Sequence, residues 1–193
     1  TDPRILTSLE LDRKLMDGDP ALKALNSAVF IQCVGSREPE RPYCSRVCCT
    51  HSVDNAVHLK EMNPGMNVFV LYRDMRTYGE RELLYKKARS LGVIFVRFAR
   101  EEKPQVRVEN GKLLVAVTDP ILGRPLELEA DLLTLATAIL PNRDEKLANF
   151  FKVPLNADGF FVERHAKLGP SEFATDGVFL CGLAHYPKPI DEA

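Results

Sequence analysis

Four of the five cysteines in this 193-residue chain lie close together in the sequence, at Cys33, Cys44, Cys48 and Cys49. A secreted disulfide scaffold spreads its cysteines along the chain and follows a charged and then apolar leader, and neither pattern is found here. The clustering favours a metal site or redox chemistry in a reducing compartment. We therefore expect a cytoplasmic protein.

Three explanations of the cysteines remain open. Free cysteines pack like small hydrophobic side chains, so these could be buried, unreactive thiols. Structural zinc takes its ligands from two close cysteine pairs, whereas Cys48 and Cys49 are adjacent and would point about 100° apart on a helix. A [4Fe–4S] cluster is wide enough to accept both, and its irons bind thiolates. We expect the cluster, with a zinc-binding or non-redox assembly module as the alternative.

The elements predicted around the cysteines alternate between strand and helix, which is typical of a Rossmann-type nucleotide-binding fold. Their order is strand, helix, strand, helix, strand, at 28–34, 45–62, 68–72, 79–90 and 93–96. An antiparallel meander then follows at 105–109, 112–118 and 126–129, with a hairpin turn at Asn110-Gly111. The strand at 130–136 returns to the parallel sheet. The sequence therefore predicts an α/β, three-layer domain.

The cysteines occupy the turn where this fold usually binds a dinucleotide. That turn normally reads G-x-G-x-x-G, so that backbone N–H groups can hold the pyrophosphate. Here the first strand ends in Cys33-Val34-Gly35-Ser36-Arg37, and one glycine remains. We expect that the domain binds no NAD(P)H and that a metal cluster occupies this position instead.

Net charge and apolar content limit the classes of partner, and the element pattern divides the chain into regions. The net charge of −1 gives no reason to expect a nucleic-acid partner, and no apolar run is long enough to cross a bilayer. We divide the chain into a connecting segment (1–26), the domain with the cysteines (27–139) and a third region (140–193) that ends in a strand at 177–182. Because the last residues look like the start of a helix, we expect a piece of a longer protein, inactive by itself.

Five stretches resemble the A subunit of heterodisulfide reductase and related quinone-interacting subunits of sulfate reducers. They are FIQCVGSR at 30–37, YCSRVCC at 43–49, VLYRDMRTYG at 70–79, DPILGR at 119–124 and FLCGLAH at 179–185. The resemblance implies a thioredoxin-reductase-like flavoprotein, an oxidoreductase in which a [4Fe–4S] cluster exchanges electrons with FAD. It also implies that 1–26 and 140–193 belong to a partial FAD domain.

Site residues follow from the same resemblance. It implies that the cluster ligands are Cys33, Cys44, Cys48 and Cys49. It further implies that Gly177, Cys181, Gly182 and Leu183 contact FAD, where a strand ends in glycine so that the backbone can approach the flavin. Cys181 itself is expected to be a packed core thiol rather than a redox partner.

The family also implies partners and a kind of reaction. Relatives work within multi-subunit complexes with ferredoxin or hydrogenase-type electron partners, form homo-oligomers, and in some cases carry out flavin-based electron bifurcation. Bifurcating relatives often carry lysine at the position of Asp54. A carboxylate there would repel a reduced, anionic flavin, which is a departure from the bifurcating pattern.

Overall fold

The computed structural model describes residues 2–193, which fold as two compact units. Unit 1 comprises the described residues up to Val34 together with Cys48–Thr137, and unit 2 comprises Gly35–Val47 and Ala138–Ala193. Val34 and Thr137 are paired on neighbouring strands, so the chain leaves the sheet of unit 1 twice at the same place. Each exit begins a segment of unit 2.

Unit 1 is built on a five-stranded parallel sheet with the order β1-β8-β2-β3-β4. Its strands are β1 (Ile5–Thr7), β2 (Ser27–Val34), β3 (Asn67–Tyr72), β4 (Ile94–Arg97) and β8 (Leu132–Thr137). The helices of unit 1 are α1 (Ser8–Met16), the short 3-10 helix η1 (Pro20–Ala24), α2 (Cys48–Met62) and α3 (Arg81–Ser90). A separate antiparallel sheet has the order β5-β6-β7, from Gln105–Glu109, Lys112–Asp119 and Arg124–Ala130.

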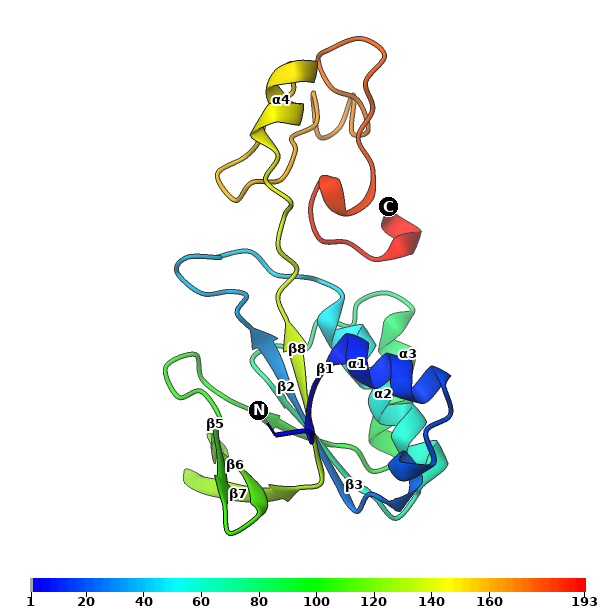
Figure 1. Ribbon diagram of the computed structural model, residues 1–193, viewed down its shortest axis with the longest axis vertical. Helices are drawn as coiled ribbons and strands as arrows, with labels where there is room; N and C mark the ends of the chain where they lie inside the picture. Colours follow the sequence, from blue (N-terminus) through cyan, green and yellow to red (C-terminus); the bar gives the residue numbers. More distant parts are fainter. Residues whose placement is uncertain (1) are drawn as a thin grey trace. The chain divides into compact units, whose positions relative to one another are not determined.

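These elements form three layers, with the parallel sheet in the middle (Figure 1). On one face, Ala28 and Phe30 of β2 pack with apolar residues of α1 and α2, among them Val53. On the other face, Val29 and Ile31 pack with residues of the antiparallel sheet. Because successive strand residues point to opposite faces, one apolar strand fills both cores. The predicted three-layer α/β fold is confirmed.

Most elements of unit 1 lie where the sequence predicts them. Thr7 caps α1, and the side chain of Glu10 reaches back to the N–H of Thr7, forming a capping box. The hairpin turns through Asn110 and Gly111, both with positive φ. Two details differ: β1 was not expected and pairs with β8, and α2 begins at Cys48 instead of residue 45. The first 26 residues therefore contribute a strand and a helix to unit 1.

Unit 2 holds a small core formed by Ala148, Val153, Phe173 and Leu180. Its helical segments are α4 (Glu145–Phe151), η2 (Gly182–Ala184) and η3 (Ile190–Glu192). The strand predicted at 177–182 is wrong, because only an isolated bridge joins Phe179 to Glu172. An apolar segment becomes a strand only where a neighbouring strand pairs with its backbone, and residues 138–193 contain isolated bridges alone.

None of the helices within residues 2–193 has the length and apolar character needed to cross a membrane.

Candidate metal centre

Cys33 lies at an irregular point near the carboxyl end of β2. Its φ is +61°, in the left-handed region that non-glycine residues seldom adopt, and the pairing of β2 with β8 shifts register between Ile31 and Val34. Such an irregularity turns a side chain away from the regular alternation of a strand. The side chain of Cys33 is buried. Strain of this kind concentrates at functional sites, so the backbone singles out Cys33 among the residues of the sheet.

Cys48 and Cys49 are the first two residues of α2, a helix of 15 residues. The unpaired N–H groups of a helix N-terminus favour negatively charged groups such as thiolates. No acidic residue stands in the first turn of α2 to compete for this position. The thiol of Cys49 donates a hydrogen bond to the carbonyl of Asp74, at 3.6 Å. A metal-bound thiolate has no proton for this bond, so metal binding would replace it.

Cys44 belongs to unit 2, on the loop Gly35–Val47 between β2 and α2. Its Sγ atom accepts a hydrogen bond of 3.3 Å from the backbone N–H of Arg46. Arg46 has a φ of +60°, and the N–H of Val47 bonds to the carbonyl of Ser45 at 2.6 Å, which makes a tight three-residue turn. This turn explains why α2 begins later than predicted, since a left-handed residue cannot continue into a right-handed helix.

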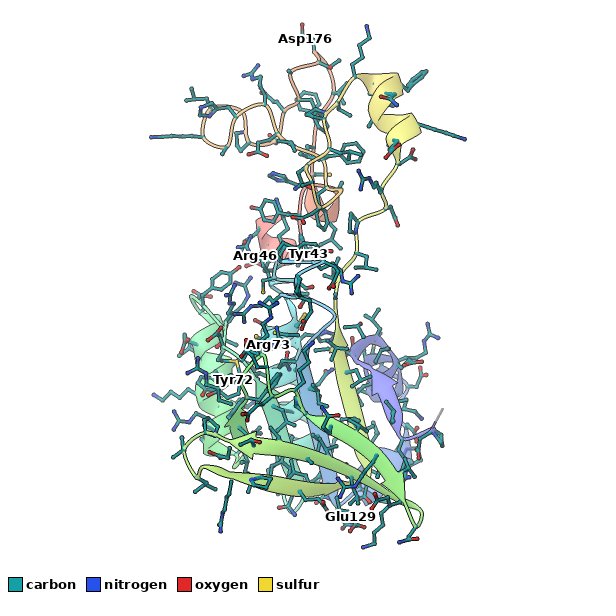
Figure 2. All side chains as sticks on the ribbon, turned by 90° about the vertical axis from the view of Figure 1, so that its left-hand side faces the viewer. Tyr43, Arg46, Tyr72, Arg73, Glu129 and Asp176 are labelled. Atoms are coloured by element: carbon teal, nitrogen blue, oxygen red, sulfur yellow. The ribbon has the colours of Figure 1, made fainter. Side chains whose placement is uncertain are left out.

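Hydrogen bonds fix the same loop within unit 2. The hydroxyl of Tyr43 donates to the carbonyl of Ile139 at 3.0 Å, and the N–H of Ile139 donates to Ser45 Oγ at 3.0 Å. Figure 2 labels Tyr43 and Arg46 on this loop. The ring of Tyr43 also meets that of Phe160 edge to face, with centroids 5.2 Å apart. The loop that carries Cys44 is therefore packed in a defined conformation.

The segment after β3 carries a buried arginine next to the residue that bonds to Cys49. Arg73 directly follows β3 and is buried, with its guanidinium 5.7 Å from the ring centroid of Phe98. It precedes Asp74, whose backbone carbonyl accepts the hydrogen bond from the thiol of Cys49. Figure 2 shows Tyr72 and Arg73 at this end of β3. The N-terminus of α2 favours a thiolate over a thiol at Cys48 and Cys49.

Unit 1 also contains buried polar side chains that no described group satisfies. Both amide atoms of Gln32, the hydroxyl of Ser52 and the hydroxyl of Thr77 are buried and have no hydrogen-bond partner within residues 2–193. Gln32 precedes Cys33, Ser52 lies one helical turn after Cys48, and Thr77 follows Asp74 by three residues. Buried polar atoms are almost always paired in proteins, so each of these side chains has room for a partner that the described residues do not supply.

A second polar arrangement, which the sequence did not reveal, joins α1 to α2. His51 Nε2 lies 2.6 Å from Asp12 Oδ2, and the amide of Asn55 donates to Asp12 Oδ1 at 2.8 Å. His51 and Asn55 are four residues apart and so share one face of α2. The contact ties the first turns of α2, where Cys48 and Cys49 lie, to its neighbouring helix.

Within residues 2–193, no three His, Cys, Asp or Glu side chains are arranged to hold a metal ion. Cys33, Cys48 and Cys49 lie in unit 1 and Cys44 lies in unit 2. The four-cysteine ligand set therefore stays a prediction. What supports it in the structure is local to each residue: the strained backbone at Cys33, the helix start at Cys48 and the N–H bonded to Cys44.

The residues expected to contact FAD lie in unit 2. Gly177 and Gly182 have φ values of +77° and +58°, and no atom lies within 4 Å of the Cβ that a side chain would add at either. A group can therefore approach the backbone closely at both positions. Cys181 is exposed, so the expected packed thiol is wrong: the segment turns into η2 after Cys181 instead of continuing as a buried strand.

Cys181 and His185 line a pocket of about 460 Å³ within unit 2. His185 is held on both sides. Lys188 Nζ donates to its Nδ1 at 3.1 Å, so Nε2 carries the proton and donates to Glu163 at 2.8 Å. The pKa of Glu163 lies below its ordinary value because its own backbone N–H and His185 hydrogen-bond to the carboxylate. Both ring nitrogens of His185 are thus engaged in hydrogen bonds at the pocket wall.

Comparison with known proteins shows which family this chain resembles. No family model matches the chain. The iron–sulfur A subunit of the CoB–CoM heterodisulfide reductase of Methanocaldococcus jannaschii is 37% identical over 97% of this chain and 31% of its own length. An Archaeoglobus profundus protein, named as similar to the heterodisulfide reductase A subunit, is 37% identical over 86% of this chain and 24% of its own length.

Solved structures support the fold. The thioredoxin reductase of T. acidophilum matches with a TM-score of 0.56 and 16% identity over 95% of this chain and 50% of its own. The flavoprotein disulfide reductase RclA of Escherichia coli matches with a TM-score of 0.55 and 12% identity, over 95% and 35%. At such identities the likeness concerns the fold. This chain, which spans about a third or less of the curated relatives it matches, belongs to the family of heterodisulfide reductase A subunits.

Proposed function

We propose that this chain is the part of an iron–sulfur flavoprotein in which electrons pass between a [4Fe–4S] cluster and FAD. The observation that supports this most strongly is the replacement of the dinucleotide-binding turn between β2 and α2 by four cysteines. The turn begins at the left-handed Cys33 and ends at the N-terminus of α2. The proposal excludes NAD(P)H from this domain, because Gly35 alone remains of the pyrophosphate-binding glycines.

The proposed ligands are Cys33, Cys44, Cys48 and Cys49. A bound cluster would supply one-electron transfer. The chain's part is to hold the thiolates and to balance their charge. The N-terminus of α2 favours the anionic sulfur atoms of Cys48 and Cys49, and the N–H of Arg46 stabilises Cys44.

The proposed FAD contacts are Gly177, Cys181, Gly182 and Leu183 in unit 2. Open space beside the backbone at both glycines supports this assignment, as does the pocket beside Cys181. The rest of the FAD site would come from parts of the protein outside these 193 residues. We therefore expect the isolated chain to bind FAD weakly and to be inactive.

We further propose that the protein works within a multi-subunit heterodisulfide reductase-like complex with ferredoxin or a hydrogenase as electron partner. The names of its relatives support this. One relative is the A subunit of the H(2)/formate:CoB-CoM heterodisulfide,ferredoxin reductase of Methanococcus maripaludis, which is 35% identical over 97% of this chain. Self-association and electron bifurcation stay predictions from the resemblance. Asp54, half-exposed on α2, argues against bifurcation.

Anaerobic reconstitution of the full-length protein tests the proposal. Because the whole protein can hold clusters elsewhere, iron is counted in wild type, in a Cys44→Ser variant and in a Cys181→Ser control. We expect C44S to lose about four irons, together with part of the broad absorption near ~400 nm that dithionite bleaches. C181S should keep its iron. A wild type that binds zinc at Cys44 instead, without iron lost in C44S, would support the assembly module.

A further inference from the structure

The side chain of Gln32 is almost completely buried, with 1% of its surface exposed. Neither its amide nitrogen nor its amide oxygen has a hydrogen-bond partner within residues 2–193. Both atoms lack partners, so exchanging nitrogen and oxygen would not remove the problem. A buried amide without partners is strongly destabilising, and such a group in a folded protein needs an explanation.

The position of Gln32 suggests that explanation. Along β2, Ala28 and Phe30 face the helices and Val29 and Ile31 face the antiparallel sheet. The same alternation directs Gln32 to the face that α2 covers. Gln32 also directly precedes Cys33, where the strand becomes irregular. An amide on this face, at the carboxyl end of β2, lies toward the N-terminus of the helix that follows.

The hydroxyl groups of Ser52, Thr77 and Thr134 share the condition of Gln32. Ser52 is fully buried on α2, and Thr77 is 1% exposed in the segment after β3, and neither hydroxyl has a partner among the described residues. Of the four unpartnered atoms of Gln32, Ser52 and Thr77, three can donate a hydrogen bond: the Gln32 amide nitrogen and the two hydroxyl oxygens. A group that accepts hydrogen bonds would satisfy the amide nitrogen of Gln32. Sulfides and thiolates accept hydrogen bonds and donate none.

We propose that the Gln32 amide donates a hydrogen bond to a sulfur atom of the cluster and thereby raises its reduction potential. This inference rests on the proposed function, since it needs the cluster that the cysteines would hold. A hydrogen bond to sulfur stabilises the more negative, reduced state more than the oxidised state. Removing the donor lowers the midpoint potential. An ordinary structural role, or pairing with a buried water, would affect stability alone.

The test variant is Gln32→Met, because methionine has nearly the same length and shape but cannot donate. The matched control is Thr134→Val on β8. Thr134 is fully buried and its hydroxyl also lacks a partner in the described chain, but it sits mid-strand beside Phe30. Both substitutions remove an unpartnered polar group with little change of volume, so they separate the effect on the cluster from the effect on folding.

The measurements are made on the full-length protein, loaded and metal-free. In the loaded protein we expect Q32M to shift the midpoint potential of the C44S-sensitive cluster to a more negative value and to change its electron paramagnetic resonance spectrum. T134V should leave both unchanged. In the metal-free protein, both variants should raise the denaturant midpoint or leave it equal, because each removes an unsatisfied buried group.

Three results would overturn the inference. An unshifted potential in Q32M, with wild-type iron content, would refute the role of Gln32 while the proposed function stands. An equal shift in T134V would show a general effect of strand packing. A wild type without a C44S-sensitive cluster would overturn the proposed function and this inference together.

Discussion

The backbone N–H of Arg46 lies 3.3 Å from the Sγ atom of Cys44, on a residue whose φ is +60°. A left-handed conformation costs a non-glycine residue about 1 kcal/mol or more. The side chain of Arg46 is tied down as well: it pairs with Glu192 at 2.9 Å and lies over the ring of Tyr186. The loop that carries Cys44 is thus held in a strained form by contacts within unit 2.

This strain predicts an unusual order of stability at position 46. Arg46→Gly and Arg46→Ala both lose the contacts with Glu192 and Tyr186, so their difference isolates the backbone. We expect R46G to be more stable than R46A by about 1 kcal/mol, since glycine adopts positive φ without penalty. The midpoints of urea unfolding measure this difference. Equal stability, or a more stable R46A, would show that the turn is unstrained.

Two histidines on α2 give a matched pair for the contact between α1 and α2. His51 bonds to Asp12, and both side chains are about one-quarter exposed, whereas His58 lies 3.8 Å from Asp54 and both are about half exposed. We expect His51→Ala to lower the free energy of unfolding of the metal-free protein by about 1–3 kcal/mol. His58→Ala should change it by less than about 0.5 kcal/mol. Chemical denaturation compares them, and equal losses would assign no special role to the Asp12 contact.

Two glycines allow a similar comparison for flavin binding. Gly182 in unit 2 and Gly18 in unit 1 have φ values of +58° and +66°, and an added Cβ meets no atom within 4 Å at either. Alanine at each position should cost about 1–2 kcal/mol of stability through backbone strain. We expect only Gly182→Ala to lower the FAD content of the full-length protein. FAD release after denaturation measures this, and an equal loss in both variants would contradict the proposed contact.

Local patterns in the sequence predicted unit 1 well, because its elements are set by neighbouring residues. The alternation of strands and helices, the capping box of Thr7 and Glu10 and the turn at Asn110-Gly111 all follow from short-range chemistry. The edge strand β1 escaped detection, since three residues carry too little pattern and their pairing with β8 joins distant parts of the chain.

The candidate site was predictable in its residue types but not in its geometry. The cysteine spacing indicated a metal centre, whereas the positive φ values of Cys33 and Arg46 have no signature in residue type. The hydrogen bond between His51 and Asp12 joins residues far apart in the sequence, and the unpartnered amide of Gln32 is visible only in the folded chain. In unit 2, the apolar run at 177–182 looked like a strand, yet extended segments need a pairing neighbour that residues 138–193 do not offer.

The hydrogen bond between Glu163 and His185 predicts a pH dependence of stability. Because the folded-state pKa of Glu163 is lowered from 4.5, this carboxylate stabilises the fold above that pH and loses its contribution as pH falls through the lower, folded-state pKa. Glu163→Gln keeps an acceptor for His185 but cannot titrate. We therefore expect E163Q to be less stable than wild type at about pH 6, with a gap that closes toward about pH 3. Denaturation at several pH values measures the gap, and Glu172→Gln, whose carboxylate pairs with Arg164 on the surface, is the control. A gap that stays constant with pH would show that the hydrogen bond, rather than the charge of Glu163, holds His185 in place.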